Sequence, residues 1–409
     1  MKKQLRQLSI YGIGQLFNLV TPLLVVPYLV LQCGVANYGK ISIGMAIAFF
    51  LMVFIDYGTD ISAVKEMAVH RDHPEKRNAI FATTLGTKAV LFVLTTLIFM
   101  GVVVLFPFFN QERALFFLGI PILLGQLLNP TWLLQGLEDF TRITLMTIGS
   151  KLVYLLLIFG CIQSPSDYIY VNLFWGIANI MAYGIILIYC FKKYHFSWED
   201  FQKNNIKTLL KNNFSLFTSQ IFVSLQMYSP IVLLGYFGSS FLAGQFRIVE
   251  QIIVIFKTYI LLFFNFVYPR VCYLIETNTR EAMRYWKSFN GMNFCFIAGS
   301  MAFLYLFSEW VVSFFTKSSI YKTADLLQWG IWVPLLMALS IPLKQLLLGY
   351  GMQRVYTRTT MILVVFSTLL IAISIPFFQI RGVFWVLIAT EMMTIILFSW
   401  YLKDRLQMK

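Results

Sequence analysis

Long apolar stretches separated by short polar ones dominate the chain. A helix that crosses the hydrocarbon core of a bilayer needs about 20 apolar residues. The stretches are unbroken and do not alternate with a period of two, which favours helices over a β-barrel. The sequence therefore predicts an all-α integral membrane protein with about 12 transmembrane helices. They are expected at residues 8–32, 40–64, 80–107, 114–135, 143–163, 168–191, 213–237, 240–268, 288–308, 325–349, 357–379 and 382–402.

The composition agrees with this class. Hydrophobic residues make up 59% of the 409 residues and charged residues 12%, whereas soluble domains have about 45–50% and about 25%. The five cysteines are scattered, which predicts neither a disulfide framework nor a metal site. The net charge of +14 is expected to reflect membrane topology and some affinity for anionic membrane lipids, so nucleic acid is not needed as a partner.

The lysines and arginines predict the orientation of the chain. With the N-terminus inside, roughly 22 of them lie on the cytoplasmic side and about 5 outside. Because basic loops stay in the cytoplasm, both termini are expected there. The chain is thus expected to cross its membrane many times.

A polar segment at residues 192–212 predicts the domain organisation. It carries lysines among spaced apolar residues, as amphipathic segments on the membrane surface do. It would separate an N-terminal six-helix bundle, residues 1–191, from a C-terminal one, residues 213–409. The interval from Pro130 to Arg142 recurs between Pro342 and Arg354, which favours two parallel repeats.

Ionisable residues inside the predicted spans are the candidate functional groups, because placing one in hydrocarbon costs about 2.5–3.5 kcal/mol on the mildest insertion scale. In the span 240–268, one stripe covering roughly 80° of arc holds three of them. The stripe comprises Arg247, Glu250, Val254, Lys257 and Leu261. The opposite face, with Ile248, Ile252 and Phe256, is expected to contact lipid. We interpret the stripe as the lining of a pathway for an anion.

A simpler interpretation applies to part of this stripe. Arg247 and Glu250 are three residues apart and could merely neutralise each other. Lys257 has no acid three or four residues away, so its partner is expected on another helix. Glu391, at mid-depth in the last span, has no nearby base and is either a proton site or a group shielded by a neighbouring helix.

The second and third spans carry charges at matching depths. Asp56 and Asp60 are four residues apart and share a helix face. Asp56 and Lys88 both lie about 12 Å from the cytoplasmic end, on helices joined by one loop. An Asp56–Lys88 pair is therefore predicted, either as structural glue or as a gate. Lys151 in the fifth span is equally deep and has no acid nearby, so its partner must lie elsewhere.

Two motifs resemble a cofactor site or a metal site, but each lacks a residue that the site requires. The run from Gly34 to Lys40 nearly matches a nucleotide-binding P-loop, but Ile41 follows where Ser or Thr would bind Mg²⁺. His70 and His73 lack a third metal ligand. No cofactor and no metal are expected. Trp132, at the end of the fourth span, is expected to be an interfacial anchor.

Several short motifs together resemble those of polysaccharide flippases. They are Pro27-Tyr28-Leu29 with Asn37-Tyr38-Gly39, Asp56-Tyr57-Gly58 with Lys65-Glu66-Met67-Ala68, the run from Pro130 to Glu138 with Ser150-Lys151, and Tyr268-Pro269-Arg270. In order and spacing the set is similar to the O-antigen and capsular polysaccharide flippase family, within the multidrug/oligosaccharidyl-lipid/polysaccharide exporter superfamily. One departure is Gln245-Phe246-Arg247, where many relatives have a Tyr-rich stretch with small residues.

The resemblance implies a transporter and not an enzyme. It implies two six-helix bundles, as in MATE transporters, around a central cationic cavity, with no nucleotide hydrolysis. The implied substrate is undecaprenyl-pyrophosphate-linked oligosaccharide, moved by alternating access from the inner to the outer leaflet of the bacterial inner (cytoplasmic) membrane, which the chain would cross many times. The candidate substrate-binding residues are Lys88, Lys151, Arg247 and Lys257, and the candidates for gating or for coupling to H⁺ or Na⁺ are Asp56, Asp60, Glu250 and Glu391. The polysaccharide polymerase machinery is a candidate partner.

Two other functions remain open at this point. A multidrug exporter of the same superfamily would need a cavity rich in unpaired acids, whereas here the bases within the spans at least match the acids. A membrane glycan polymerase or ligase would need a large outer loop with acids or histidine. The one long outer loop expected here, about residues 309–325, contains only Glu309 and Asp325 as acids.

Overall fold

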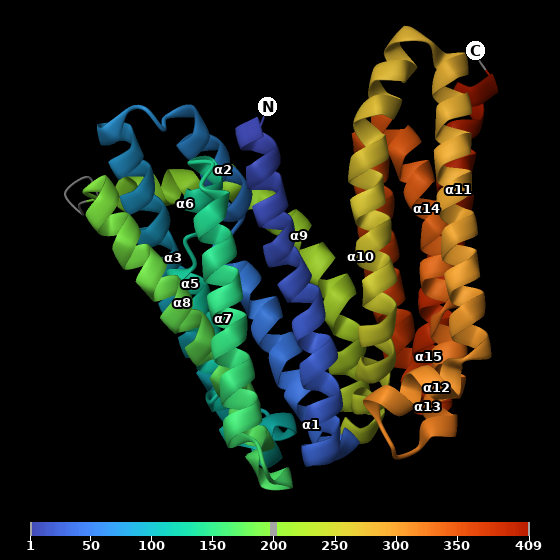
Figure 1. Ribbon diagram of the computed structural model, residues 1–409, viewed down its shortest axis with the longest axis horizontal. Helices are drawn as coiled ribbons and strands as arrows, with labels where there is room; N and C mark the ends of the chain where they lie inside the picture. Colours follow the sequence, from blue (N-terminus) through green and yellow to red (C-terminus); the bar gives the residue numbers. More distant parts are fainter. Residues whose placement is uncertain (1, 197–202, 408–409) are drawn as a thin grey trace. The chain divides into compact units, whose positions relative to one another are not determined.

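A computed structural model describes residues 2–196 and 203–407, with side chains at residues 10, 12–196 and 206–403, and the described chain is helical almost throughout (Figure 1). The first half contains α1 (Lys2–Asp56), α2 (Thr59–Val69), α3 (Pro74–Leu105), η1 (Pro107–Glu112), α4 (Arg113–Phe117), α5 (Ile120–Leu128), α6 (Thr131–Gly136), α7 (Phe140–Cys161), η2 (Pro165–Tyr170) and α8 (Val171–Tyr194). The second half contains α9 (Lys203–Phe237), α10 (Ser240–Thr277), α11 (Thr279–Leu306), α12 (Ser308–Phe315), α13 (Ile320–Gly330), α14 (Trp332–Gly349) and α15 (Gln353–Gln407).

The predicted all-α membrane class is confirmed. Within the described residues, 9 helices are long and apolar enough to cross a membrane, or 10 if the bent pair Pro107–Phe117 and Ile120–Gly136 forms one span. Both α1 and α15 are 55 residues long and contain a break, at Gly34 and at Gln379 respectively. These breaks fall where the sequence predicts turns between consecutive spans. The total of twelve spans stays a prediction.

Internal contacts divide the chain into two compact units, Met1–Tyr228 and Ser229–Lys409, with the boundary inside α9. Of the predicted linker at residues 192–212, residues 197–202 lie outside the described part of the chain, and residues 203–212 begin α9. The division into six-helix bundles at residues 1–191 and 213–409 stays a prediction.

The predicted span 40–64 is interrupted. Helix α1 ends at Asp56, Tyr57 and Gly58 adopt positive φ values of 45° and 76°, and α2 begins at Thr59. A Cβ atom at position 58 would lie 2.8 Å from the Cβ of Leu216 in α9. Glycine therefore permits both the left-handed turn and the close approach of α9. Asn213 of α9 donates a hydrogen bond of 2.7 Å from Nδ2 to the Ser62 Oγ in α2.

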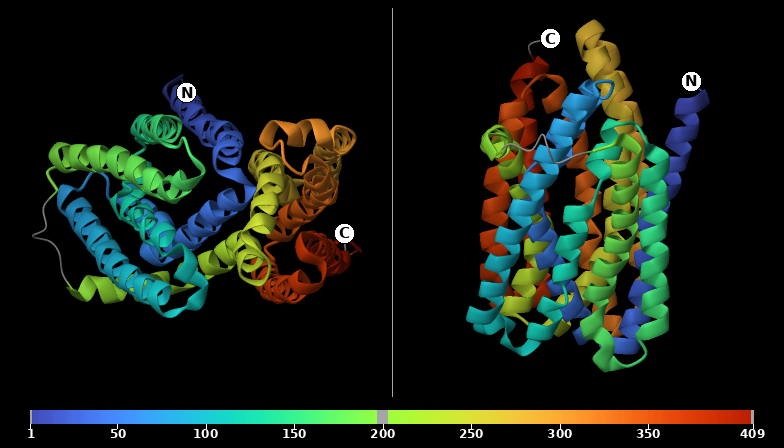
Figure 2. Two further views of the ribbon diagram at one scale, coloured as in Figure 1. Left: turned by 90° about the horizontal axis from the view of Figure 1, so that it is seen from below. Right: turned by 90° about the vertical axis from the view of Figure 1, so that its left-hand side faces the viewer.

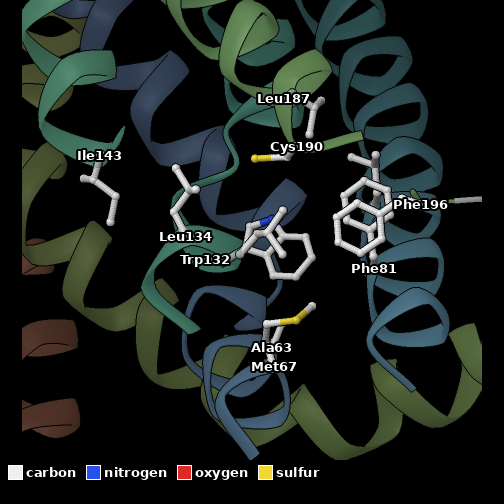
Figure 3. Close-up of a cluster of buried hydrophobic side chains, with 11 residues drawn as sticks. Ala63, Met67, Phe81, Trp132, Leu134, Ile143, Leu187, Cys190 and Phe196 are labelled. Carbon is white, nitrogen blue, oxygen red and sulfur yellow. The ribbon is translucent and has the colours of Figure 1, made fainter. Parts of the chain in front are cut away.

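A buried apolar cluster holds α2, α3, α6, α7 and α8 together at one end of the first unit (Figure 3). The Phe81 ring stacks on Phe196 at 4.0 Å, and the Trp132 indole, only 4% exposed, lies beside Phe81 at 6.1 Å. The expectation that Trp132 is an interfacial anchor is therefore wrong. The short helix α6 has little length to bury, so its large indole contributes much of the apolar surface that attaches it to the unit.

The second unit packs α10, α11, α14 and α15 side by side. Helices α10 and α11 form a long hairpin with its turn at Asn278, visible in Figures 1 and 2 as the yellow and orange pair. Ile248 and Ile252 of α10 are buried, 0% and 3% exposed, whereas Leu261 is 45% exposed. The expectation that the Ile248 face contacts lipid is therefore wrong. That face packs within its own unit, and the charged stripe runs along the less buried side of α10.

Candidate functional site

A buried ion pair joins α1 to α3 in the first unit. The Lys88 side chain is 2% exposed, and its Nζ lies 3.0 Å from Oδ1 of Asp56. Gln126 of α5 donates from Nε2 to Oδ2 of Asp56 at 2.6 Å, and Asn129 donates to Oε1 of Gln126 at 3.3 Å. The predicted Asp56–Lys88 pairing is confirmed, and the Gln126 amide binds the second carboxylate oxygen.

The local sequence explains why Lys88 can be buried. Helix α3 is buried from Phe81 to Lys88, and this segment also contains Thr83, Thr84 and Thr87. Desolvation of two charges is offset only when both are paired and hydrogen bonded. Asp56 meets this condition because Lys88 and Gln126 occupy its two oxygens. Lys88 is thus already neutralised and is poorly suited to bind a substrate anion by itself.

Asp60 has a different environment. It is exposed at the start of α2, and both of its carboxylate oxygens accept hydrogen bonds from Nε2 of Gln220, at 2.8 and 2.7 Å. Gln220 belongs to α9. Asp60 therefore helps to attach α2 to α9, about one turn after the Asp56–Lys88 pair.

Lys151 has an aromatic partner in place of an acid. Its side chain is 7% exposed, and its Nζ lies 3.8 Å from the centroid of the Trp175 ring in α8. Among the described residues no carboxylate lies within ion-pair distance of Lys151. The Trp175 ring also contacts Tyr154 at 5.0 Å and Phe49 at 5.9 Å. An ammonium over an indole face is the strongest form of cation–π contact, but it leaves the positive charge uncompensated.

A cavity of about 240 Å³ in the first unit is lined by one residue that contacts the Asp56–Lys88 pair and by one that contacts Lys151. Its aromatic lining is Phe49, Trp175, Tyr183 and Tyr228, and its amide lining is Gln126 and Asn179. Gln126 is the residue that binds Asp56, and Trp175 is the ring beneath Lys151. We call these lining residues with Asp56, Lys88 and Lys151 the N-terminal site. It combines a neutralised ion pair, an uncompensated cation and several aromatic faces.

The stripe on α10 is internally paired. Arg247 and Glu250 form an ion pair of 2.7 Å, with 28% and 14% of their side chains exposed. The simpler interpretation, that these two residues neutralise each other, therefore describes a contact that is present. Glu391 of α15 accepts a hydrogen bond of 2.6 Å from the Ser340 Oγ, whereas Lys257 forms no ion pair with a described residue. Arg247, Glu250 and Glu391 thus each have a polar partner within the second unit.

Sequence reasoning missed the neutral members of these networks. Gln126 is the single polar side chain in the apolar run of α5, Ile120–Leu128, and that isolation was a usable signal. Trp175 carries no such signal because tryptophan is common in apolar helices. Gln220 and Ser340 were hidden for a similar reason, since hydroxyl and amide side chains are frequent in membrane helices.

Residues 5–274 match the family described as "Polysaccharide biosynthesis protein". The chain belongs to this family. Two relatives, each named "Putative O-antigen transporter", come from Escherichia coli (strain K12) and Shigella dysenteriae, with 29% identity over 255 residues and 27% over 257 residues. These matches span 61% and 62% of this chain, and equal shares of the relatives' lengths.

Solved structures of transporters share the fold of this family member. An inward-facing multidrug resistance MATE family transporter of the MOP superfamily superimposes with a TM-score of 0.75 at 15% identity, covering 98% of this chain and 97% of that one. The lipid II flippase MurJ, in an inward closed conformation, gives 0.75 at 13% identity, covering 96% and 87%. These likenesses establish the architecture. The relatives and neighbours are named transporters and flippases, in agreement with the expectation that the chain is not an enzyme.

Proposed function

We propose that this protein moves undecaprenyl-pyrophosphate-linked oligosaccharide units from the inner to the outer leaflet of the bacterial cytoplasmic membrane. Membership of the polysaccharide biosynthesis family and the two relatives named O-antigen transporters support this substrate class. In this proposal the breaks at Gly34 and Gln379 divide α1 and α15 into two spans each, which gives twelve spans with both termini in the cytoplasm.

The observation that carries the proposal is Lys151. Its ammonium is buried, rests on the Trp175 ring and has no acid within reach among the described residues. A buried cation without a counter-ion is costly, and an arriving anion removes that cost. A pyrophosphate next to the adjoining cavity would supply the missing negative charge. A site built for cationic drugs would instead leave an acid uncompensated.

The other lining groups suit the sugar portion. The faces of Trp175, Tyr183 and Tyr228 offer apolar surfaces for the C–H faces of pyranose rings, and the amides of Gln126 and Asn179 can bond hydroxyl groups. The cavity of about 240 Å³ is too small for a whole lipid-linked oligosaccharide. It would hold the part of the substrate next to the phosphates.

Coupling to an ion would act through the paired acids. Protonation of Asp56 would remove the charge that holds Lys88, and would free a second buried cation next to the same cavity. We propose H⁺ as the coupling ion, because a carboxylate held by lysine and amide donors offers Na⁺ few free oxygens.

A rescue experiment tests the proposed function. A strain lacking the gene should accumulate unpolymerised lipid-linked units on the inner leaflet, and expression of the intact chain should remove them. Lys151→Gln should abolish this rescue at equal protein abundance. Lys193→Gln is the matched control, because Lys193 also lies over aromatic rings but is exposed at the end of α8. Full rescue by Lys151→Gln, or drug resistance without any effect on lipid-linked glycan, would refute the proposal.

A further inference from the structure

A larger pocket lies in the second unit, away from the charged stripe of α10. Its volume is about 740 Å³, and residues from the start of α10, from α13 and from the region around the break in α15 line it. We call it the α13–α15 pocket. Among its lining residues are Gln245, Lys322, Asp325, Gln379, Arg381 and Trp385. Volumes of about 300–1,000 Å³ are usual for small-molecule sites. Under the proposed orientation this end of the unit faces the outer side of the membrane.

Aromatic rings line the pocket and remain uncovered. Tyr321, Phe377, Phe378 and Trp385 are 76%, 75%, 52% and 39% exposed. The Phe378 and Trp385 rings lie 5.1 Å apart, and Trp385 also contacts Trp329 at 5.8 Å. Trp385 is thus held in place on one side while its other surface is open. Aromatic residues at a membrane interface commonly anchor the protein, but an anchor alone does not require convergent polar groups.

Polar groups do converge on this pocket. Arg381 donates from Nη2 and Nε to the same oxygen of Asp325, Oδ2, at 2.8 and 3.2 Å. The pair is open, with 56% and 40% of the two side chains exposed, so other guanidinium hydrogens and the second carboxylate oxygen can bind a ligand. Lys322 lines the same pocket and forms no ion pair with a described residue. Donors and acceptors therefore stand side by side with aromatic faces.

The backbone of the pocket is strained at one position. Gln379 has φ 52° and ψ −133°, a combination that disfavours residues with a Cβ atom. Glycine would be the ordinary residue for such a break. Strain of this kind costs about 1–3 kcal/mol and clusters at ligand-binding sites. Gln379 itself, at the strained position, is one of the residues that line the pocket.

We propose that the α13–α15 pocket binds the oligosaccharide part of the substrate, separately from the phosphates. This inference rests on the proposed function. The arginine is already paired with a carboxylate, and Lys322 is exposed to solvent, unlike the buried Lys151, so the pocket has no buried cation that needs a phosphate. The acid of the pair is likewise not free for a cation. Paired arginine and aspartate offer both donors and acceptors to sugar hydroxyls, and the rings offer faces to the pyranose. An oligosaccharide is the ligand class that uses all of these groups together.

Direct binding tests this proposal. The full chain in lipid nanodiscs is titrated calorimetrically with the oligosaccharide unit, released from its lipid by mild acid, and separately with undecaprenyl phosphate. Arg381→Ala and Phe378→Ala should each weaken oligosaccharide binding at least tenfold and leave undecaprenyl phosphate binding unchanged. The control is Trp310→Ala, because Trp310 in α12 is 69% exposed and is not among the residues that line the pocket.

The outcomes separate this inference from the proposed function. Unchanged oligosaccharide affinity in both pocket variants refutes the pocket assignment, as does an intact chain that restores lipid-linked glycan export but binds no free oligosaccharide. In either case the flippase proposal survives. Failure of the intact chain to rescue the deletion strain refutes the flippase proposal, whatever the pocket binds.

Discussion

The ammonium of Lys151 lies 3.8 Å from the centre of the Trp175 ring, buried in the first unit of the protein. The other buried lysine of this unit, Lys88, has a carboxylate partner instead, Asp56. Within one unit, therefore, one buried lysine belongs to an ion pair, and the other has no carboxylate partner among the described residues. The two arrangements predict opposite responses to neutralising substitutions.

Lys151→Gln should separate stability from function. Removing an uncompensated buried charge should leave the thermal unfolding midpoint unchanged or raise it, because the cation–π contact contributes only about 2 kcal/mol against a large desolvation cost. Rescue of glycan export should nevertheless be lost, and Lys151→Arg should retain part of it. The measurements are thermal unfolding in detergent and lipid-linked glycan analysis. A clear fall in the unfolding midpoint would mean that Lys151 is structural.

The Asp56–Lys88 pair should behave in the reverse way. Asp56→Asn or Lys88→Gln alone leaves one buried charge without its partner and should cost about 3–5 kcal/mol of stability. The double variant removes both charges and should recover most of that loss, but should not transport. The control pair is Asp325 with Arg381, whose side chains are 40% and 56% exposed. Breaking it by Asp325→Asn should cost about 0–1 kcal/mol. Additive losses in the Asp56–Lys88 double variant would contradict this prediction.

The contacts that the sequence could predict are those between helices joined by one short loop. Asp56 and Lys88 occupy matching depths on consecutive spans, so their pairing follows from helix geometry alone. The hydrogen bond from Ser340 to Glu391 could not be predicted in this way. These two residues are 51 positions apart, on α14 and α15, and single-sequence periodicity does not say which side chains of two helices face each other.

Periodicity also fails to assign faces when every face is apolar. Helix α10 buries Ile248 and Ile252 and leaves its charged stripe more exposed. The sequence does not reveal this, because isoleucine is equally stable against lipid and in the protein interior. Trp132 illustrates the same limit. Its position at the end of a span favours an interfacial role, but the short helix α6 needs its indole for packing. The cavity next to Lys151 could not be predicted either, since its lining comes from several helices that are distant in sequence.

Gly58 should tolerate no side chain. Gly58 has φ 76°, and an added Cβ would lie 2.8 Å from the Leu216 Cβ, so Gly58→Ala combines backbone strain with a clash against α9. The expected loss is about 1–3 kcal/mol, together with weaker attachment of α2. Gly101→Ala is the matched control, because no atom lies within 4 Å of its added Cβ and the site is helical. Thermal unfolding of both variants checks this. Equal midpoints would show that the turn at Tyr57 and Gly58 adjusts freely.

Gln379→Gly tests whether the strain at the break of α15 serves ligand binding. Glycine adopts the observed φ and ψ without the penalty of a Cβ atom, so the folded state should gain about 1 kcal/mol, less the entropy that glycine adds to the unfolded chain. Oligosaccharide affinity should fall, because the glutamine side chain leaves the wall of the pocket. Gln328→Gly, inside helix α13, is the control and should lose about 1 kcal/mol from the helix interior, and more through the hydrogen bonds that Gln328 Nε2 donates to Tyr305 O and Ser308 Oγ. Thermal unfolding measures the stability, and calorimetric titration measures the oligosaccharide affinity. A destabilised Gln379→Gly variant with unchanged affinity would show that neither the backbone strain nor the glutamine side chain contributes to ligand binding.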